Sequence, residues 1–422
     1  MKFVALYIGK IVVIVGRMLG KRGSSFPGLV VEKISPNFLP NALRSLPGGV
    51  IVVTGTNGKT TTVKMIAEVL GTREQVLTNK TGANFTRGIA STILMSMSLT
   101  GKLAQRIAVF EIDEAWAVRF VDAVQTRGVV ITNVMRDQMD RFGEIDHTAR
   151  LLRHVVGKAQ EFVVLNADDP RVAAMADAAQ CPVTYFGVGP QLRRVFITDD
   201  ELYAADIDVA AVHASRPRPD YVLEHIEPNA ITITTEAGPT DVALHVFGSH
   251  NAQNATAALA AGRLAGVPLA DAVGALERME AAFGRGEFID INGQRLLLQL
   301  VKNPGGFRYS LMDVASVTPA EVLIAINDEY ADGRDVSWLW DVDFTSLSAW
   351  PVSTTGTRAE DMALRLEYDS VPVATVVPDM RQALIGLSGR HPAGATLVVC
   401  ATYTAMFEMR DVLATMTEVA PV

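Results

Sequence analysis

The chain is 422 residues long and 49% hydrophobic, so we expect two or three domains with large apolar cores. The net charge of −8, without a basic stripe, argues against nucleic acid as the main partner because its phosphates would be repelled. Two cysteines, Cys181 and Cys400, are too few for a disulfide framework or a thiolate metal site, which indicates a reducing cytoplasm.

The N-terminal segment from Phe3 to Leu19 is largely apolar, but Lys10 and Arg17 interrupt it. A spanning helix needs about 20 apolar residues, and no cleavage site typical of a signal peptide follows. We therefore expect a helical segment within residues 1–46 whose apolar side either docks on the protein or lies on a membrane surface. On a membrane, five basic residues would face the lipid headgroups: Lys2, Lys10, Arg17, Lys21 and Arg22.

A glycine turn follows the apolar run from Val50 to Val53 and leads into a helical pattern from Val63 to Leu70. This strand–loop–helix layout is typical of a phosphate cradle, in which backbone N–H groups bind phosphate oxygens at the positive end of a helix. Lys59 would add a charge for the β- and γ-phosphates, and the Thr60 hydroxyl would hold Mg²⁺. A plain glycine turn would not need Gly-Lys-Thr in that order, so the sequence favours a nucleotide site.

From residue 75 to residue 166, apolar strand-like runs alternate with amphipathic helix-like runs. This pattern predicts a parallel sheet covered on both faces, with ligands beyond the carboxyl ends of its strands. The expected strands are residues 75–78, 107–111, 128–133 and 162–166, and the expected helices are residues 89–99, 118–124 and 145–156. Polar residues closing these strands are site candidates: Glu111, Asn133 and Asn166.

Three acids follow one of these strands, in Glu111-Ile112-Asp113-Glu114. Mg²⁺ prefers hard oxygen ligands, so Glu111 is the favoured metal ligand and Asp113 and Glu114 are weaker candidates. The alternative is that the acids only begin a solvated helix.

The remaining sequence predicts a small antiparallel addition and then a second α/β unit. The antiparallel part covers residues 187–246, with strands at 230–234 and 242–246, and a long helix begins near residues 248–254. The strands expected in the second unit are residues 295–301, 322–326, 364–368 and 395–401. The expected domains are a helical segment at 1–46, a nucleotide-binding domain at 47–288 and a C-terminal α/β domain at 289–422.

Several motifs carry a resemblance to known enzymes. Residues 55–61 resemble the ATP loop of the Mur ligases, which form amide bonds on peptidoglycan precursors, and of the folylpolyglutamate synthases. Two further motifs are similar to theirs: Thr132-Asn133 with Asp137 and Asp140, and His250-Asn251 with Asn254. Longer motifs resemble the MurT family, the synthetase subunits of lipid II isoglutaminyl synthase, at residues 133–144, 302–307, 331–338, 355–360 and 402–404.

The resemblance covers most of the chain, and it implies a Mur-ligase-type P-loop central domain with a parallel sheet plus a C-terminal Rossmann-like α/β domain. It implies ATP and Mg²⁺ as ligands, with Lys59 also catalytic because it neutralises charge on the transferring phosphoryl group. Thr60 and Glu111 would hold the metal, Asn254 would hydrogen-bond the adenine, and Arg285 would reach the phosphates. The phosphate loop would consist of Gly55, Thr56, Asn57, Gly58, Lys59, Thr60 and Thr61.

Members of the MurT family work with a glutaminase called GatD, and an aspartate of the family completes a Cys-His-Asp arrangement in that partner. The matching residue is Asp335, which would orient the imidazole and stabilise its developing charge. An aspartate in such a polar loop is ordinarily a solvated turn residue. The choice rests on the motif alone, because four other aspartates lie near: Asp328, Asp332, Asp341 and Asp343.

The chain departs from the family pattern in three places. Gln138 replaces a histidine that helps to bind a second metal ion, so that second site is in doubt. Residues 143–156 contain no lysine where many relatives carry a carbamoylated one, and Arg150 stands near the expected place. Residues 187–220 contain no cysteine, so the zinc ribbon common in the family cannot form and no zinc is expected.

The implied function is an ATP-dependent amidation in peptidoglycan synthesis. The α-carboxyl of D-glutamate in the lipid II stem peptide would become an acyl phosphate, and ammonia would convert it to D-isoglutamine. Cys181 and Cys400 are expected to be core residues, so the ammonia would come from a GatD-type partner in a cytoplasmic heterodimer at the inner membrane face. Two rivals stay open: a stand-alone ligase that adds an amino acid, and a non-catalytic nucleotide-binding scaffold.

Overall fold

The computed structural model describes residues 2–18, 25–79, 85–136, 145–193, 195–196, 198, 216–227, 229–279 and 285–417. By their contacts these residues form two compact units. The first comprises the described residues within Met1–Met135, Glu144–Leu244 and Asn251–Met279, and the second those within Arg136–Gly143, His245–His250 and Glu280–Val422. The domain boundaries expected after residues 46 and 288 stay predictions.

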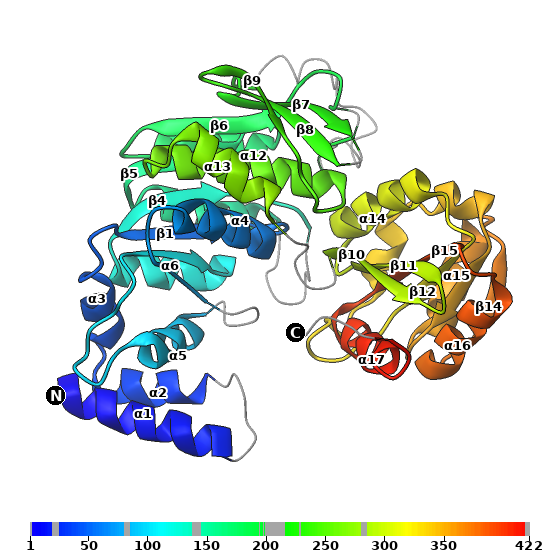
Figure 1. Ribbon diagram of the computed structural model, residues 1–422, viewed down its shortest axis with the longest axis horizontal. Helices are drawn as coiled ribbons and strands as arrows, with labels where there is room; N and C mark the ends of the chain where they lie inside the picture. The colour runs from blue at the N-terminus through cyan, green and yellow to red at the C-terminus, as the bar shows by residue number, and fades with distance from the viewer. Residues whose placement is uncertain are drawn as a thin grey trace. The chain divides into compact units, whose positions relative to one another are not determined.

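The first unit is built on a nine-stranded sheet in the order β2-β3-β1-β4-β5-β6-β7-β8-β9 (Figure 1). The pairs from β2 to β7 in this order are parallel, and β8 and β9 continue the sheet in antiparallel pairing. Every residue of β1 and β3 is buried, because helices cover both faces of the parallel part. The strands are β1 Val50–Thr54, β2 Val76–Thr78, β3 Ile107–Glu111, β4 Thr126–Ile131, β5 Ala159–Asn166, β6 Val183–Val188, β7 Tyr221–Glu227, β8 Ala230–Thr235 and β9 Gly238–Val242.

The predicted alternation of strands and helices in this unit is confirmed. The helices described between Lys2 and Glu277 are α1 Lys2–Met18, α2 Phe26–Ile34, α3 Phe38–Leu43, α4 Lys59–Gly71, α5 Thr86–Ser96, α6 Glu114–Ala123, α8 Ile145–Val156, α9 Pro170–Ala173, the 3-10 helix η1 Ala174–Ala178, α12 Ser249–Leu264 and α13 Leu269–Glu277. None of the helices in the described part of the chain combines the length and apolar character needed to cross a bilayer.

The second unit contains a six-stranded sheet in the order β10-β11-β15-β12-β13-β14. The edge strand β10 is antiparallel to β11, and the other pairs are parallel. The strands are β10 Arg285–Ile291, β11 Gln294–Leu300, β12 Glu321–Ala325, β13 Val352–Thr355, β14 Val373–Val376 and β15 Thr396–Ala401. The helices are α14 Pro304–Val317, η2 Ser337–Asp341, η3 Thr345–Ala349, α15 Ala359–Tyr368, α16 Met380–Arg390 and α17 Tyr403–Leu413.

Two strand predictions were wrong. Residues 364–368 lie in helix α15. Leu364 and Tyr368, four residues apart, share an exposed side of the helix, whereas Leu366 lies on the buried side. Residues 243–246 lie outside any strand, because β9 ends at Val242. Its partner β8 begins at Ala230, so antiparallel pairing stops there.

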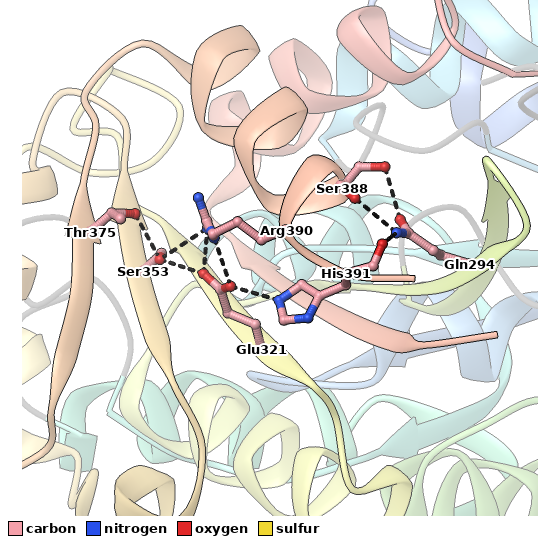
Figure 2. Close-up of polar contacts among 7 residues, drawn as sticks. All are labelled: Gln294, Glu321, Ser353, Thr375, Ser388, Arg390 and His391. Carbon is pink, nitrogen blue, oxygen red and sulfur yellow. Dashed lines mark hydrogen bonds and ion pairs between the residues drawn. The ribbon is translucent and has the colours of Figure 1, made fainter. Parts of the chain in front are cut away.

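A buried carboxylate ties together the amino ends of β12 and β13 in the second sheet (Figure 2). Glu321 opens β12, and its Oε1 accepts hydrogen bonds from Arg390 Nη2 and Ser353 Oγ, each at 2.5 Å. Its Oε2 accepts one from Arg390 Nε at 3.1 Å and lies 2.8 Å from His391 Nε2. Burial alone would raise the pKa of Glu321, but these hydrogen bonds hold it below its ordinary value.

Replacing Glu321 by glutamine should destabilise the second unit by about 3 kcal/mol, because Arg390 would lose its buried counter-charge. Urea unfolding of the full chain measures the change as a lower midpoint. Glu367→Gln is the control, because Glu367 is exposed on α15 and should leave the midpoint unchanged. Equal midpoints for the two variants would show that the Glu321 network adds no stability.

Candidate functional site

The phosphate loop lies between β1, in the interior of the first sheet, and α4. Two of its glycines have left-handed backbones, with φ of 124° at Gly55 and 83° at Gly58. A Cβ at Gly55 would lie 2.4 Å from Thr132 Oγ1, and one at Gly58 would lie 2.4 Å from Asn254 Oδ1. Positions 55 and 58 therefore require glycine. Without Cβ atoms there, the backbone of the loop can form a cradle for a phosphate group.

The segment after β4 holds the loop in this shape. Asn133 Oδ1 accepts a hydrogen bond from the Asn57 N–H at 2.8 Å, and Asn133 Nδ2 donates to the Asn57 carbonyl at 3.1 Å. The Met135 N–H donates to Thr56 Oγ1 at 3.0 Å. Thr56 and Asn57 are thus loop-fixing residues in this structure, and their predicted contact with phosphate stays a prediction.

Strand β5 in turn fixes the segment after β4. Asn166 Nδ2 donates to the Thr132 carbonyl at 2.9 Å, and the Val134 N–H donates to Asp169 Oδ2 at 2.7 Å. Burial raises the pKa of Asp169 to about 6, against the lowering effect of hydrogen bonds such as that from Val134. Asn166, which the sequence marked as a site candidate, therefore acts here as a positioning residue.

Lys59 begins α4 and is buried, with 7% of its surface exposed. Its Nζ donates to the Gly55 carbonyl at 2.6 Å and lies 3.4 Å from Asp113 Oδ1 and 3.5 Å from Glu114 Oε2. From the sequence, the two acids were predicted to be weaker candidates for metal ligands, and their pairing with Lys59 was not predicted. The available signal was their position after β3, the parallel neighbour of β1.

Glu111 closes β3 and is buried, beside Val53 in the register of the sheet. Asn79 fixes its backbone, because the Glu111 N–H donates to Asn79 Oδ1 at 2.9 Å and Asn79 Nδ2 donates to the Glu111 carbonyl at 2.8 Å. A carboxylate, the Thr60 hydroxyl and phosphate oxygens form a ligand set that suits Mg²⁺. Across the residues that the structure describes, no group of three or more His, Cys, Asp or Glu side chains is arranged to hold a metal.

The first turn of α4 contains a further polar atom that fits a ligand. Thr61 Oγ1 is buried and has no hydrogen-bond partner among the described residues. Buried hydroxyls are normally satisfied, so this atom and the glycine cradle fit a bound polar group such as a phosphate. The role of Thr61, like those of Thr60 and Glu111, stays a prediction.

Asn254, on α12, is buried against the phosphate loop, as its close approach to Gly58 shows. Its Nδ2 donates to Asn251 Oδ1 at 3.3 Å. The predicted contact of Asn254 with adenine is untested. Arg285 opens β10, but its side chain lies outside the described residues, as do the motif residues Asp137, Gln138 and Asp140.

Replacing Gly58 by alanine should weaken ATP binding at least tenfold, because an added Cβ must displace Asn254 and the left-handed backbone costs about 1–3 kcal/mol. Calorimetric titration with ATP measures the loss. Gly71→Ala is the matched control: it lies at the end of the same helix, and a Cβ there meets no atom within 4 Å. Equal affinity of the two variants for ATP would contradict the prediction that this loop binds the phosphates.

The second unit places Asp335 in an exposed loop beyond the carboxyl end of β12. Its Oδ1 accepts a hydrogen bond from the Ser337 N–H at 2.8 Å, and this contact with Ser337 lowers the pKa of Asp335. The carboxylate is therefore ionised, exposed and held by a local turn.

The loop that carries Asp335 is braced by a different aspartate, Asp332, which is buried. Asp332 accepts hydrogen bonds from the Thr404 N–H at 2.7 Å, from the Thr404 hydroxyl and from the Glu329 N–H at 3.1 Å. From the sequence alone, it was not possible to tell that Asp332 fixes the loop while Asp335 is exposed on it, since both lie in the same motif.

Cys400 is a core residue, as predicted, whereas Cys181 lies at the margin of a core. Cys400 is fully buried in β15, and burial raises the pKa of its thiol to about 12. Cys181 is partly buried and packs against the core of the first unit, and burial raises its pKa as well. Neither side chain is therefore poised to ionise as a nucleophile.

Two family models match the chain: the Mur ligase middle domain over residues 53–262, and the MurT ligase C-terminal domain over residues 300–406. The MurT subunit of glutamine-hydrolysing lipid II isoglutaminyl synthase from Streptococcus pneumoniae is 32% identical in an alignment 429 positions long that spans 93% of each chain. The subunit of the same name from Staphylococcus aureus strain COL is 30% identical over 410 residues, which cover 89% of this chain and 90% of that one.

Among solved structures, the MurF ligase from Thermotoga maritima in complex with ADP matches with a TM-score of 0.70 and 16% identity. The match covers 92% of this chain and 83% of the MurF chain. At this identity the likeness shows the fold alone. Together with the family model for the middle domain, it confirms the architecture that the sequence predicted.

Proposed function

Because the chain belongs to the MurT family of ligases in peptidoglycan synthesis, we propose that it is the synthetase subunit of a lipid II isoglutaminyl synthase. Its substrate is the α-carboxyl of D-glutamate in the lipid II stem peptide, and its product is D-isoglutamine. A GatD-type partner subunit hydrolyses glutamine and supplies the ammonia. The heterodimer works in the cytoplasm, at the inner face of the membrane.

The reaction has two steps. A carboxylate oxygen attacks the γ-phosphorus of ATP, the bond from that phosphorus to the bridging oxygen breaks, and ADP leaves. Ammonia then attacks the acyl carbon of the resulting acyl phosphate, phosphate leaves with the electrons of the carbon–oxygen bond, and the nitrogen loses a proton. Activation is necessary because oxide is a poor leaving group.

The residues of the first unit have distinct roles in this proposal. The glycine cradle binds the phosphates, and Lys59 stabilises the negative charge on the γ-phosphoryl group as it transfers. Before ATP binds, Asp113 and Glu114 pair with the buried ammonium, since an unpaired buried cation is unfavourable. Thr60 and Glu111 would hold Mg²⁺, which neutralises phosphate charge when bound.

The observation that carries the proposal is the glycine cradle closed around a buried Lys59, in a chain whose residues 300–406 match the C-terminal domain of MurT ligases. The cradle supports use of ATP, and the C-terminal match supports an ammonia-dependent amidation with a partner. Asp335 stands in that matched segment on a braced loop, which suits a carboxylate that must be presented to another protein.

Amidation of lipid II by the purified chain, with and without its partner, tests the proposal. With ATP and ¹⁵N-labelled ammonia, the chain alone should form the labelled amide, whereas labelled glutamine should serve only when the partner is present. ATP turnover with an amino acid, in the absence of glutamine and partner, would identify the stand-alone ligase instead. Nucleotide binding without amide formation in any mixture would identify a scaffold.

A further inference from the structure

Helix α1 has two apolar faces, and only one of them is packed on the protein. Ala5 and Leu6 are buried, and Gly9 lies so close to its neighbours that a Cβ there would be 2.4 Å from Val31 Cγ2 and 2.7 Å from Leu94 Cδ2. These contacts fix α1 against α2 and α5, which lie beside it (Figure 1). The helix is therefore an integral part of the first unit.

The opposite face of α1 consists of large hydrophobic side chains in solvent. Between 38% and 59% of the surface of each is exposed, in Val4, Tyr7, Ile8, Ile11, Ile14 and Val15. Their spacing of three and four residues places them on one side of the helix. Proteins rarely expose so many large apolar side chains together unless the surface binds something. We call these six residues the outer face of α1.

The first 31 residues of the sequence carry only positive side-chain charges. The chain has a net charge of −8, yet its first acidic residue is Glu32. Lys2 and Arg17 lie near the two ends of α1, and Lys21 and Arg22 follow it. Lys10 does not contribute to a headgroup contact as the sequence suggested, because its Nζ donates to the Met97 carbonyl at 2.5 Å.

We propose that the outer face of α1 docks on the surface of an anionic lipid bilayer, with the helix lying parallel to the membrane. Helices with an apolar face and flanking cations bind lipid interfaces by burying that face among the acyl chains while the cations meet anionic headgroups. At 17 residues, α1 is about 25 Å long, which suits an interfacial position. A second copy of the chain fits less well, because two such helices would bring segments of equal positive charge together.

This docking is independent of ATP chemistry, and it deepens the proposed function by placing the enzyme on the surface that holds a lipid-linked substrate. Its test therefore uses vesicles without lipid II, ATP or partner, so failure of the docking and failure of the proposed amidation can be told apart.

Sedimentation of the full chain with phospholipid vesicles measures the docking. The chain should bind vesicles that contain phosphatidylglycerol more tightly than vesicles of phosphatidylcholine alone, and added salt should weaken the binding. The double variant Ile11→Glu/Ile14→Glu should bind the anionic vesicles at least tenfold more weakly, because two side chains would no longer be buried in lipid. The matched control is Leu364→Glu/Ile385→Glu, which changes two side chains of the second unit that are half or more exposed, as Ile11 and Ile14 are.

Thermal unfolding should be the same for both double variants, since all four positions are exposed. Equal vesicle binding by the α1 variant and the control would overturn the proposal, as would a native chain that does not bind anionic vesicles. A dimer in solution that only the α1 variant dissociates would assign the outer face to a second copy and would also overturn it.

Discussion

Replacing Lys59 by alanine should eliminate amide formation from both ammonia and glutamine, with a loss of at least about a hundredfold to a thousandfold in rate. In the proposed mechanism both reactions need the acyl phosphate, and the Lys59 charge would stabilise its formation. In the variant without ATP, the carboxylates of Asp113 and Glu114 should repel each other, because they would lose the ammonium that lies 3.4–3.5 Å from them. Rates of labelled amide formation from each nitrogen source measure the effect.

Lys102→Ala is the control for Lys59→Ala, because Lys102 is an exposed lysine of the same unit. It should leave both rates unchanged. A Lys59→Ala variant that keeps either reaction near the native rate would remove this residue from the phosphoryl transfer.

Replacing Asp335 by asparagine should abolish amidation driven by glutamine and spare amidation driven by free ammonia. The asparagine Oδ1 can still accept the hydrogen bond from the Ser337 N–H, so the turn is preserved while the charge is lost. In the proposed arrangement an imidazole base in the partner would lose its anionic support when the carboxylate becomes an amide, and such a change costs about 10⁴ in rate in a comparable triad. The two nitrogen sources, compared in the heterodimer, give the readout.

Asp343→Asn is a matched control for Asp335→Asn. Asp343 is also exposed, and its Oδ1 likewise accepts a hydrogen bond from the N–H two residues ahead, that of Thr345, at 2.9 Å. It should leave both reactions intact. Equal loss of the glutamine and ammonia reactions in Asp335→Asn would place Asp335 in the synthetase site or in the fold instead.

The phosphate loop and the parallel sheet of the first unit could be predicted from the sequence because both depend on local patterns. The strand Val50–Thr54 is apolar up to Val53, the glycines take backbone angles that other residues avoid, and Lys59 follows the second of them. Glu111 at the end of β3, and Lys59 at the start of the helix that follows β1, were expected near each other by the same logic, since parallel strands end at one edge.

Contacts between distant segments could not be predicted in the same way. The pairing of Lys59 with Asp113 and Glu114, and the close approach of Asn254 to Gly58, depend on tertiary packing. The error at residues 364–368 has a related cause. The alternating hydrophobic residues imitate a strand, and only the packing of the unit shows that Leu366 is buried while its neighbours Leu364 and Tyr368 are exposed.

The Glu321 network and the loop of Asp335 lie at opposite ends of the strands in the second sheet. The Glu321 network ties the amino ends of β12 and β13, whereas Asp335 follows the carboxyl end of β12. Substitutions in the exposed loop can therefore change what it presents to solvent and leave the ion pair that anchors the opposite edge of the sheet in place.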